Sequence, residues 1–107
     1  MIAQTIQNQI CLYLDKYPQF CLFTMTAPGH YDYTSRFIRK GWPQISGQWG
    51  ARPLYIVVRE ESAIIPLAQQ QLIEQAKKLG AIAFAAASVD EVVAELNRFT
   101  GGPKSAA

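Results

Sequence analysis

Apolar residues recur at helical spacing near the start of the chain. Four of them repeat every four positions, namely Ile2, Ile6, Ile10 and Leu14. This spacing predicts an amphipathic helix, which Pro18 brings to an end. Residues 19–26 then change to a run rich in aromatic and branched side chains, which is typical of a β-strand.

The middle of the chain alternates between turn-forming residues and short apolar runs. Residues 27–35 are rich in Pro, Gly, Asp and Ser and predict a loop, while residues 36–42 show no clear pattern. Residues 43–47 predict a short strand, followed by a turn over residues 47–50. Residues 53–59 (PLYIVVR) are apolar on both faces, which predicts a strand at the centre of a sheet.

A helical pattern returns in the second half of the chain. Residues 67–79 place apolar side chains on one face and polar ones on the other, and Gly80 is typical of a left-handed cap. Residues 81–87 (AIAFAAA) predict a buried strand. Ser88 and Glu91 form a capping-box pattern, which predicts the start of a last helix.

The predicted order is helix, three strands, helix, strand, helix. Neighbouring middle strands are expected to pair antiparallel, and the last strand, reached through a helix, parallel to its neighbour. We therefore expect one α/β domain over residues 1–100, with helices on both faces of a small mixed sheet. Residues 101–107 (GGPKSAA) predict a disordered tail.

Composition narrows the class of protein. Half of the 107 residues are hydrophobic and 17% are charged, a balance too apolar for a disordered chain. The longest apolar run, residues 80–87, is far shorter than the roughly 18 residues of a spanning helix, and no secretory signal is expected. Cys11 and Cys21 make no disulfide framework or metal set, so we expect reduced thiols in a cytoplasmic protein without a membrane partner.

The net charge of +2 is distributed unevenly. Between Tyr33 and Arg59 there is no acidic residue, and the stretch holds five basic ones: Arg36, Arg39, Lys40, Arg52 and Arg59. Aromatic side chains are interleaved in the same region, namely Tyr31, Tyr33, Phe37 and Trp42. Basic residues contact the phosphates of nucleic acids, so this stretch is a candidate nucleic-acid surface, although scattered solvated charge would give the same pattern.

Three stretches together resemble a known family. They are the pair Ile6-Gln7, residues 36–47 (RFIRKGWPQISG), and residues 53–79 with the glycine that follows. Over residues 2–97 the chain resembles the small stand-alone VRR-NUC nucleases, a branch of the PD-(D/E)XK superfamily related to Holliday-junction resolvases and restriction endonucleases. The resemblance implies a restriction-endonuclease-like αβββαβ core, and it also implies a phage or mobile-element origin.

The residues at the family's motif positions depart from its pattern. Members carry Gly-x-Pro-Asp where this chain has Gly41-Trp42-Pro43-Gln44, so Gln44 stands in the place of the aspartate. The Glu-x-Lys of the next strand is replaced by Val57 and Arg59. The early glutamate of the first helix is missing, whereas the glutamine of the following helix is retained as Gln69, or else as Gln70.

These replacements remove the chemistry that the resemblance implies. Such nucleases use carboxylates to hold Mg²⁺ or Mn²⁺, and hard cations need chiefly anionic oxygen ligands. Gln44 is neutral, Val57 has no ligand atom, and Arg59 cannot act as a base. We therefore expect no metal cofactor and no intact catalytic residue, and hence a folded pseudo-nuclease that binds nucleic acid, DNA above all, without cleaving it.

Two alternatives remain open. The chain could be a protein-interaction or inhibitor module that contacts a partner, or a second copy in a homodimer, through Ile64-Ile65-Pro66-Leu67; otherwise Ile65 and Leu67 simply cover the start of the helix. It could also be a working nuclease with a relocated site built from His30, Asp32, Arg59 and Gln69. Trp42 and Trp49 are expected to pack against the sheet more than to stack on bases.

Overall fold

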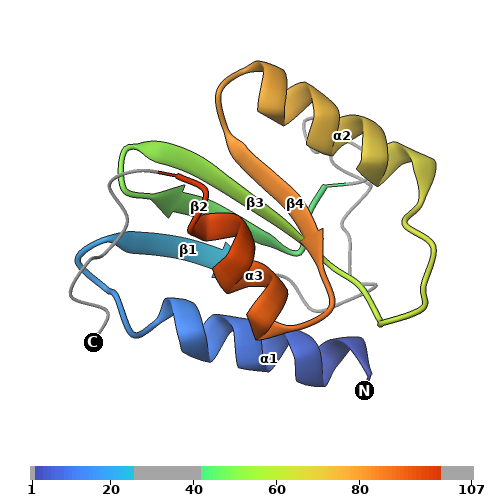
Figure 1. Ribbon diagram of the computed structural model, residues 1–107, viewed down its shortest axis with the longest axis horizontal. Coiled ribbons are helices and arrows are strands. Elements are labelled where there is room, and N and C mark those ends of the chain that lie inside the picture. The colour runs from blue at the N-terminus through green and yellow to red at the C-terminus, as the bar shows by residue number, and fades with distance from the viewer. Residues whose placement is uncertain (1, 26–41, 100–107) are drawn as a thin grey trace.

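Seven helices and strands follow one another in the computed structural model, which describes residues 2–25 and 42–99 (Figure 1). They are α1 (Ala3–Leu14), β1 (Cys21–Met25), β2 (Ile45–Trp49), β3 (Arg52–Val58), α2 (Leu67–Lys78), β4 (Ile82–Ala86) and α3 (Val89–Leu96). The predicted order of elements is confirmed. The loop and the tail expected at residues 27–35 and 101–107 lie outside the described residues.

The strands form one mixed sheet in the order β1-β2-β3-β4. The β1–β2 and β2–β3 pairs are antiparallel, and β4, which follows α2 along the chain, pairs parallel with β3. Both expectations about strand direction are therefore confirmed, and β3 lies inside the sheet as its continuous apolar run predicts.

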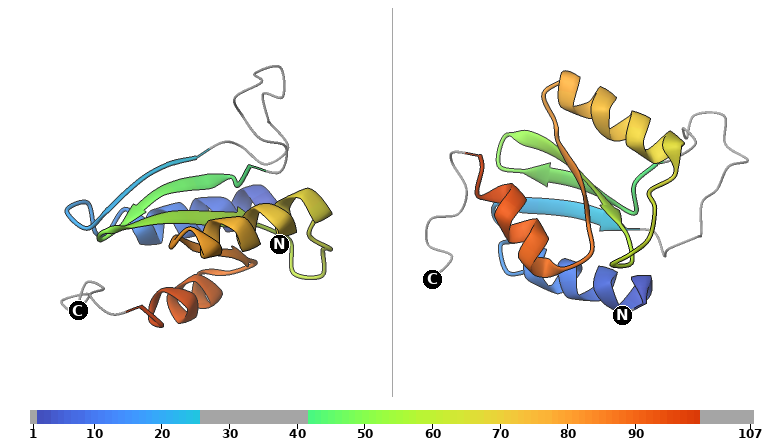
Figure 2. Two further views of the ribbon diagram at one scale, coloured as in Figure 1. Left: turned by 90° about the horizontal axis from the view of Figure 1, so that it is seen from above. Right: turned by 45° about the vertical axis from the view of Figure 1, so that its right-hand side comes forward.

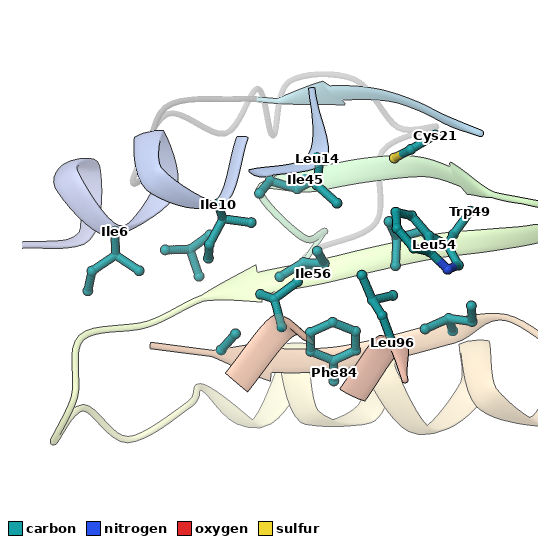
Figure 3. Close-up of a cluster of buried hydrophobic side chains, with 14 residues drawn as sticks. Ile6, Ile10, Leu14, Cys21, Ile45, Trp49, Leu54, Ile56, Phe84 and Leu96 are labelled. Atoms are coloured by element: carbon teal, nitrogen blue, oxygen red, sulfur yellow. The ribbon is translucent and has the colours of Figure 1, made fainter. Parts of the chain in front are cut away.

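Helices cover both faces of the sheet. The main core lies between the sheet and the pair α1 and α3. Figure 3 draws its buried side chains and labels Ile6, Ile10, Leu14, Cys21, Ile45, Trp49, Leu54, Ile56, Phe84 and Leu96. On the opposite face a smaller cluster joins Ile73 of α2 to Val57 and Ala83. Figure 2 shows that α3 lies on one side of the sheet. Because α2 contacts β3 and β4, it leaves Leu22 and Gln48, on the same face of β1 and β2, exposed.

The first turn of the sheet differs from the prediction. A turn was expected over residues 47–50, but β2 continues to Trp49 and the chain reverses at Gly50, whose φ is 60°. Gly47 lies within β2 because β1 passes very close to it, and a Cβ there would overlap the carbonyl oxygen of Leu22. The glycine that looked like a turn residue therefore serves close strand packing.

The ends of the later helices agree with their sequence signals. Gly80 follows α2 with a φ of 92°, and its N–H donates to the carbonyl of Lys77 at 3.0 Å. The hydroxyl of Ser88 accepts the N–H of Glu91 at 3.2 Å at the start of α3. Both caps are thus formed as predicted.

The two cysteines are free thiols. Cys21 is buried in the main core, and burial raises its pKa to about 11. Within the described part of the chain, no helix has the length and apolar character needed to cross a membrane.

Candidate functional site

The structure brings the first two motif positions together. The register that pairs Ile45 with Ile56 places Gln44, one residue before β2, directly opposite Val57. Residues opposite each other in an antiparallel pair are close neighbours. An aspartate at 44 and a glutamate at 57 would therefore adjoin, as a shared metal site requires.

Gln44 is buried and uses its amide to complete the sheet. If the ladder continued, Val58 would face Pro43, which has no N–H to donate. The side chain of Gln44 bonds the backbone of Val58 instead: its Nε2 donates to the carbonyl at 3.2 Å, and its Oε1 accepts the N–H at 2.9 Å. Both polar ends of the amide are thus engaged in holding β2 to β3.

Val57 forms part of the apolar packing under α2. Its side chain is 1% exposed and belongs to the cluster with Ile73 and Ala83. A carboxylate at this position would be buried among apolar groups without a compensating cation, which is strongly unfavourable. Valine here therefore favours the folded chain, and it provides no ligand atom.

The guanidinium of Arg59 is held by local groups. Its Nη1 donates to the carbonyls of Glu61 at 2.8 Å and Glu60 at 3.3 Å, and its Nη2 makes an ion pair with Glu91 at 3.4 Å. The other carboxylate oxygen of Glu91 accepts the N–H of Ala87 at 2.7 Å. The charge of Arg59 is therefore directed toward the start of α3 and is already paired with a carboxylate.

The glutamines quoted for the resemblance lie in the helices. Gln7 is fully buried in α1, and Gln69 is buried in the first turn of α2. Gln70 points differently, since its Nε2 donates to the carbonyl of Ile65 at 2.6 Å. Gln69, rather than Gln70, therefore occupies an interior position.

The basic residues expected to bind nucleic acid do not all meet. Arg52 begins β3 and stacks over the ring of Phe99 at 5.1 Å, whereas Arg59 follows the other end of that strand. Seven residues of extended chain separate them by about 23 Å. The remaining candidates, Arg36, Arg39, Lys40, His30 and Asp32, lie outside the described residues.

The described residues do not fit a divalent metal. Over residues 2–25 and 42–99, no three side chains of His, Cys, Asp or Glu come together in a group that could hold an ion. The one oxygen and one nitrogen that Gln44 offers are neutral amide atoms already bound to the backbone of Val58. Mg²⁺ and Mn²⁺ need several oxygen ligands, chiefly anionic, so we derive no metal-dependent step.

An apolar groove against α2 was not anticipated from the sequence. It holds about 380 Å³ between α2 and β3, and its walls include Trp42, Tyr55, Leu72 and Leu79. The rings of Trp42 and Tyr55 meet edge to face with centroids 5.6 Å apart. A signal was present in the apolar face predicted for residues 67–79, which includes Leu72 and Leu79.

The two tryptophans pack as expected. Trp49 is buried, and its ring meets those of Tyr17 and Phe20 edge to face at 6.0 and 4.9 Å. Trp42 is half-buried against Tyr55. Neither ring lies free on the surface.

The apolar residues before α2 divide into two groups. Ile65 packs against the Val57 cluster, as expected of a residue that covers the helix start. Leu67, in contrast, is 67% exposed and Ile64 is 90% exposed, so the expectation that Leu67 also covers the helix start is wrong. Pro66, with φ of −55° and ψ of 145°, is the residue that directly precedes the helix.

Comparison with known proteins supports the fold. No family model matches the chain, and no curated protein matches it. A solved structure described as a VRR_NUC domain protein superposes with a TM-score of 0.64 at 16% identity, covering 94% of this chain and 91% of that one. The chain therefore has a VRR-NUC-like, restriction-endonuclease-like fold.

Proposed function

We propose that this protein is a pseudo-nuclease that binds DNA or another nucleic acid without metal-dependent cleavage. One observation carries the proposal: the two positions that adjoin where carboxylates would hold a metal are a glutamine bound to the backbone of Val58 and a buried valine. The fold is kept while the ligand atoms are absent from these positions.

The charge of the chain supports binding. Five basic and no acidic residues lie between Tyr33 and Arg59. Carboxylates at positions 44 and 57 would repel phosphates in the absence of a metal, so neutral residues there favour approach of a phosphate backbone. Affinity arising from lysine and arginine contacts falls with salt concentration.

A mobility-shift titration tests binding, and the same mixtures test cleavage. Labelled duplex, single-stranded and branched DNA are titrated with the protein at low salt, then incubated with Mg²⁺ or Mn²⁺. We expect a shift that weakens as salt rises, with no new product. Absence of any shift at about 10 μM protein would contradict binding, and a product that grows with enzyme concentration would contradict the loss of cleavage.

Two sets of variants locate the binding residues. Replacing Arg36, Arg39 and Lys40 together with glutamine should weaken binding about tenfold or more and lower its salt dependence. Replacing Lys77 and Lys78 together with glutamine is the control, because both lysines lie in the last turn of α2, outside the basic stretch. If both variants lose the same amount of affinity for DNA, the attraction comes from the overall charge of the protein and not from a defined binding surface.

Protein binding is a second candidate function, favoured by the exposure of Ile64 and Leu67. An inhibitor of nucleases would reduce cleavage by an active VRR-NUC nuclease when added in trans, and this inhibition would persist at saturating DNA. The double variant Ile64→Ser, Leu67→Ser should abolish the effect. Absence of inhibition by the wild-type protein would remove this version of the function.

A further inference from the structure

We propose that the apolar groove against α2 takes an unpaired base of a single-stranded nucleic acid, with Trp42 and Tyr55 as its aromatic walls. The inference rests on the proposed nucleic-acid binding and names the form that is bound, a strand whose bases are not held in a duplex. It is carried by the chemistry of the groove and by the place of Trp42 in the basic stretch of the sequence.

The groove has the size and the lining of a pocket for a small planar group. It holds about 380 Å³, near the small end of the range of about 300–1,000 Å³ that is usual for ligand pockets. Leu72 and Leu79 line it from the side of α2, and Pro53 lies with the two aromatic rings on the side of β3. The exposed side chain of Gln75 adds an amide group to the lining. This combination suits a nucleobase, which has stacking faces and hydrogen-bonding edges.

The geometry of the two rings is compatible with stacking. Their centroids lie 5.6 Å apart and their planes are inclined at 73°, which is an edge-to-face contact. In such a contact one ring presents its edge, so the contact uses neither face of that ring. Trp42 and Tyr55 are each half-buried, so neither ring is enclosed in the core. The contact between the rings can therefore persist when a base stacks on one of them.

A second hollow extends from the same two rings toward β1. It holds about 440 Å³ and shares Trp42 and Tyr55 with the groove, while the rest of its described lining belongs to β1 and β2. Hydroxyl and amide groups line it at Thr24, Ser46 and Gln48. Because β3 lies between β2 and β4, the two hollows lie on opposite sides of Tyr55. A strand with one base in the groove therefore finds polar side chains for its neighbouring nucleotide across the sheet.

The charge near the groove favours a ligand that carries phosphates. Among the described residues that line the two hollows, none is acidic. Arg39 and Lys40 come three and two residues before Trp42 in the sequence, so the basic stretch includes a ring of the groove. Proteins that bind single strands combine positive charge for the backbone with aromatic side chains for the bases. We infer from this combination that the occupant is a nucleic acid and not an uncharged apolar molecule.

The groove is expected to distinguish single strands from duplexes. A base in a duplex is paired and stacked, and it must leave the helix before it can enter a pocket, which costs free energy. An unpaired base does not have this cost. The bases should therefore add affinity for a single strand and add little for a duplex.

Fluorescence anisotropy of labelled strands of about twelve nucleotides measures the contribution of the bases. One strand carries thymine bases, and its control has abasic sites with the same number of phosphates. Because the two strands have the same charge, any difference in affinity comes from the bases. We expect the thymine strand to bind about tenfold more tightly, which is the scale of stacking on one aromatic side chain. A duplex of the same length, titrated in parallel, reports the nucleic-acid binding on which the inference rests.

Variants of the groove locate the bound base. Trp42→Ala should remove most of the difference between the two strands, and Trp42→Phe, which keeps a ring, should retain most of it. A matched pair leaves both rings in place: Gln75→Glu and Gln71→Glu each add a carboxylate at an exposed position of α2, and of the two residues Gln75 lines the groove. Gln75→Glu should therefore weaken binding of the thymine strand more than Gln71→Glu does.

Three results would overturn the inference. Equal affinity for the thymine and abasic strands, with the duplex also bound, would show that the bases stay outside the groove and would leave the proposed function intact. Equal losses in Gln75→Glu and Gln71→Glu, or a strand difference that survives Trp42→Ala, would place the bases elsewhere. If neither strand nor the duplex binds at about 10 μM protein, the inference fails together with the proposed function.

Discussion

At the scale of single residues, Gln44 has a role that neither an aspartate nor an alanine could fill. Its amide donates to and accepts from the same backbone residue, Val58, at the point where Pro43 interrupts the ladder. A carboxylate accepts but does not donate when ionised, and an aspartate side chain is also shorter. At the position where the sequence resemblance places an aspartate, this chain therefore has a side chain that connects two strands.

Gln44→Ala should lower the free energy of unfolding by about 2 kcal/mol, because it leaves two buried backbone groups of Val58 without partners. Gln48→Ala is the matched control: Gln48 lies in the same region, and its exposed amide donates to the carbonyl of Gly50 at 2.8 Å. The Gln48→Ala change should lower the free energy of unfolding by no more than about 0.5 kcal/mol. Chemical denaturation measures both, and equal effects would refute a special role for Gln44.

Val57→Glu should destabilise the protein by about 3 kcal/mol or more, because it places a charge in the cluster with Ile73 and Ala83. Val57→Thr introduces a side chain of similar shape and without charge. It should therefore lower the free energy of unfolding clearly less than Val57→Glu does. Thermal unfolding in metal-free buffer distinguishes them. A Val57→Glu protein as stable as the wild type would show that the position still tolerates a carboxylate.

The buried thiol of Cys21 should be chemically inert in the native protein. Burial raises its pKa to about 11, so at pH 8 it remains protonated, and the thiolate is the reactive form. In the unfolded chain the pKa returns toward 9.0, and reactivity rises. Alkylation followed by peptide mass spectrometry should show Cys21 protected until denaturant is added; rapid native labelling would contradict its burial.

At the scale of elements, capping decides where α3 begins. Ser88 accepts the N–H of Glu91, while the carboxylate of Glu91 binds both the N–H of Ala87 and the guanidinium of Arg59. One acidic side chain thus joins the end of β4, the start of α3 and the segment after β3. This contact gives Arg59 a structural role, because it ties the segment after β3 to the start of α3.

Ser88→Ala should cost about 1 kcal/mol of unfolding free energy, the usual effect of losing an N-cap. Ser62→Ala, in the exposed turn after β3, provides the control and should change stability by less than about 0.5 kcal/mol. Urea unfolding curves of the two variants make the comparison. Equal midpoints would mean that the cap contributes little in this helix.

The elements were largely predictable from local patterns, and the exceptions have physical causes. The caps at Gly80 and Ser88 depend on neighbouring residues alone, so their signals can be read directly. Gly47 was predicted to end a strand and begin a turn, because glycine in sequence gives no sign of whether it serves a positive φ or a close strand. Only the position of β1 against β2 distinguishes the two.

At the scale of the whole molecule, the sequence predicted the strands that carry Gln44 and Val57, but not which site residues meet or what they do there. Burial of Val57 followed from the prediction of a central strand, whereas its place opposite Gln44 is given only by the register of β2 and β3. The bond from Gln44 to Val58 and the pairing of Arg59 with Glu91 involve segments distant in sequence. Such contacts depend on the arrangement of the elements in space, which periodicity alone does not give.

The central claim is that a VRR-NUC-like fold persists here without its metal site, and a Mn²⁺ titration followed by NMR tests it most directly. Paramagnetic broadening of backbone amide signals reports any ion held close to them. We predict no selective broadening at Gln44, Val57 or Val58 up to about 1 mM Mn²⁺, since no anionic ligands are present at the two motif positions. Selective broadening of these three signals at substoichiometric Mn²⁺ would contradict the account.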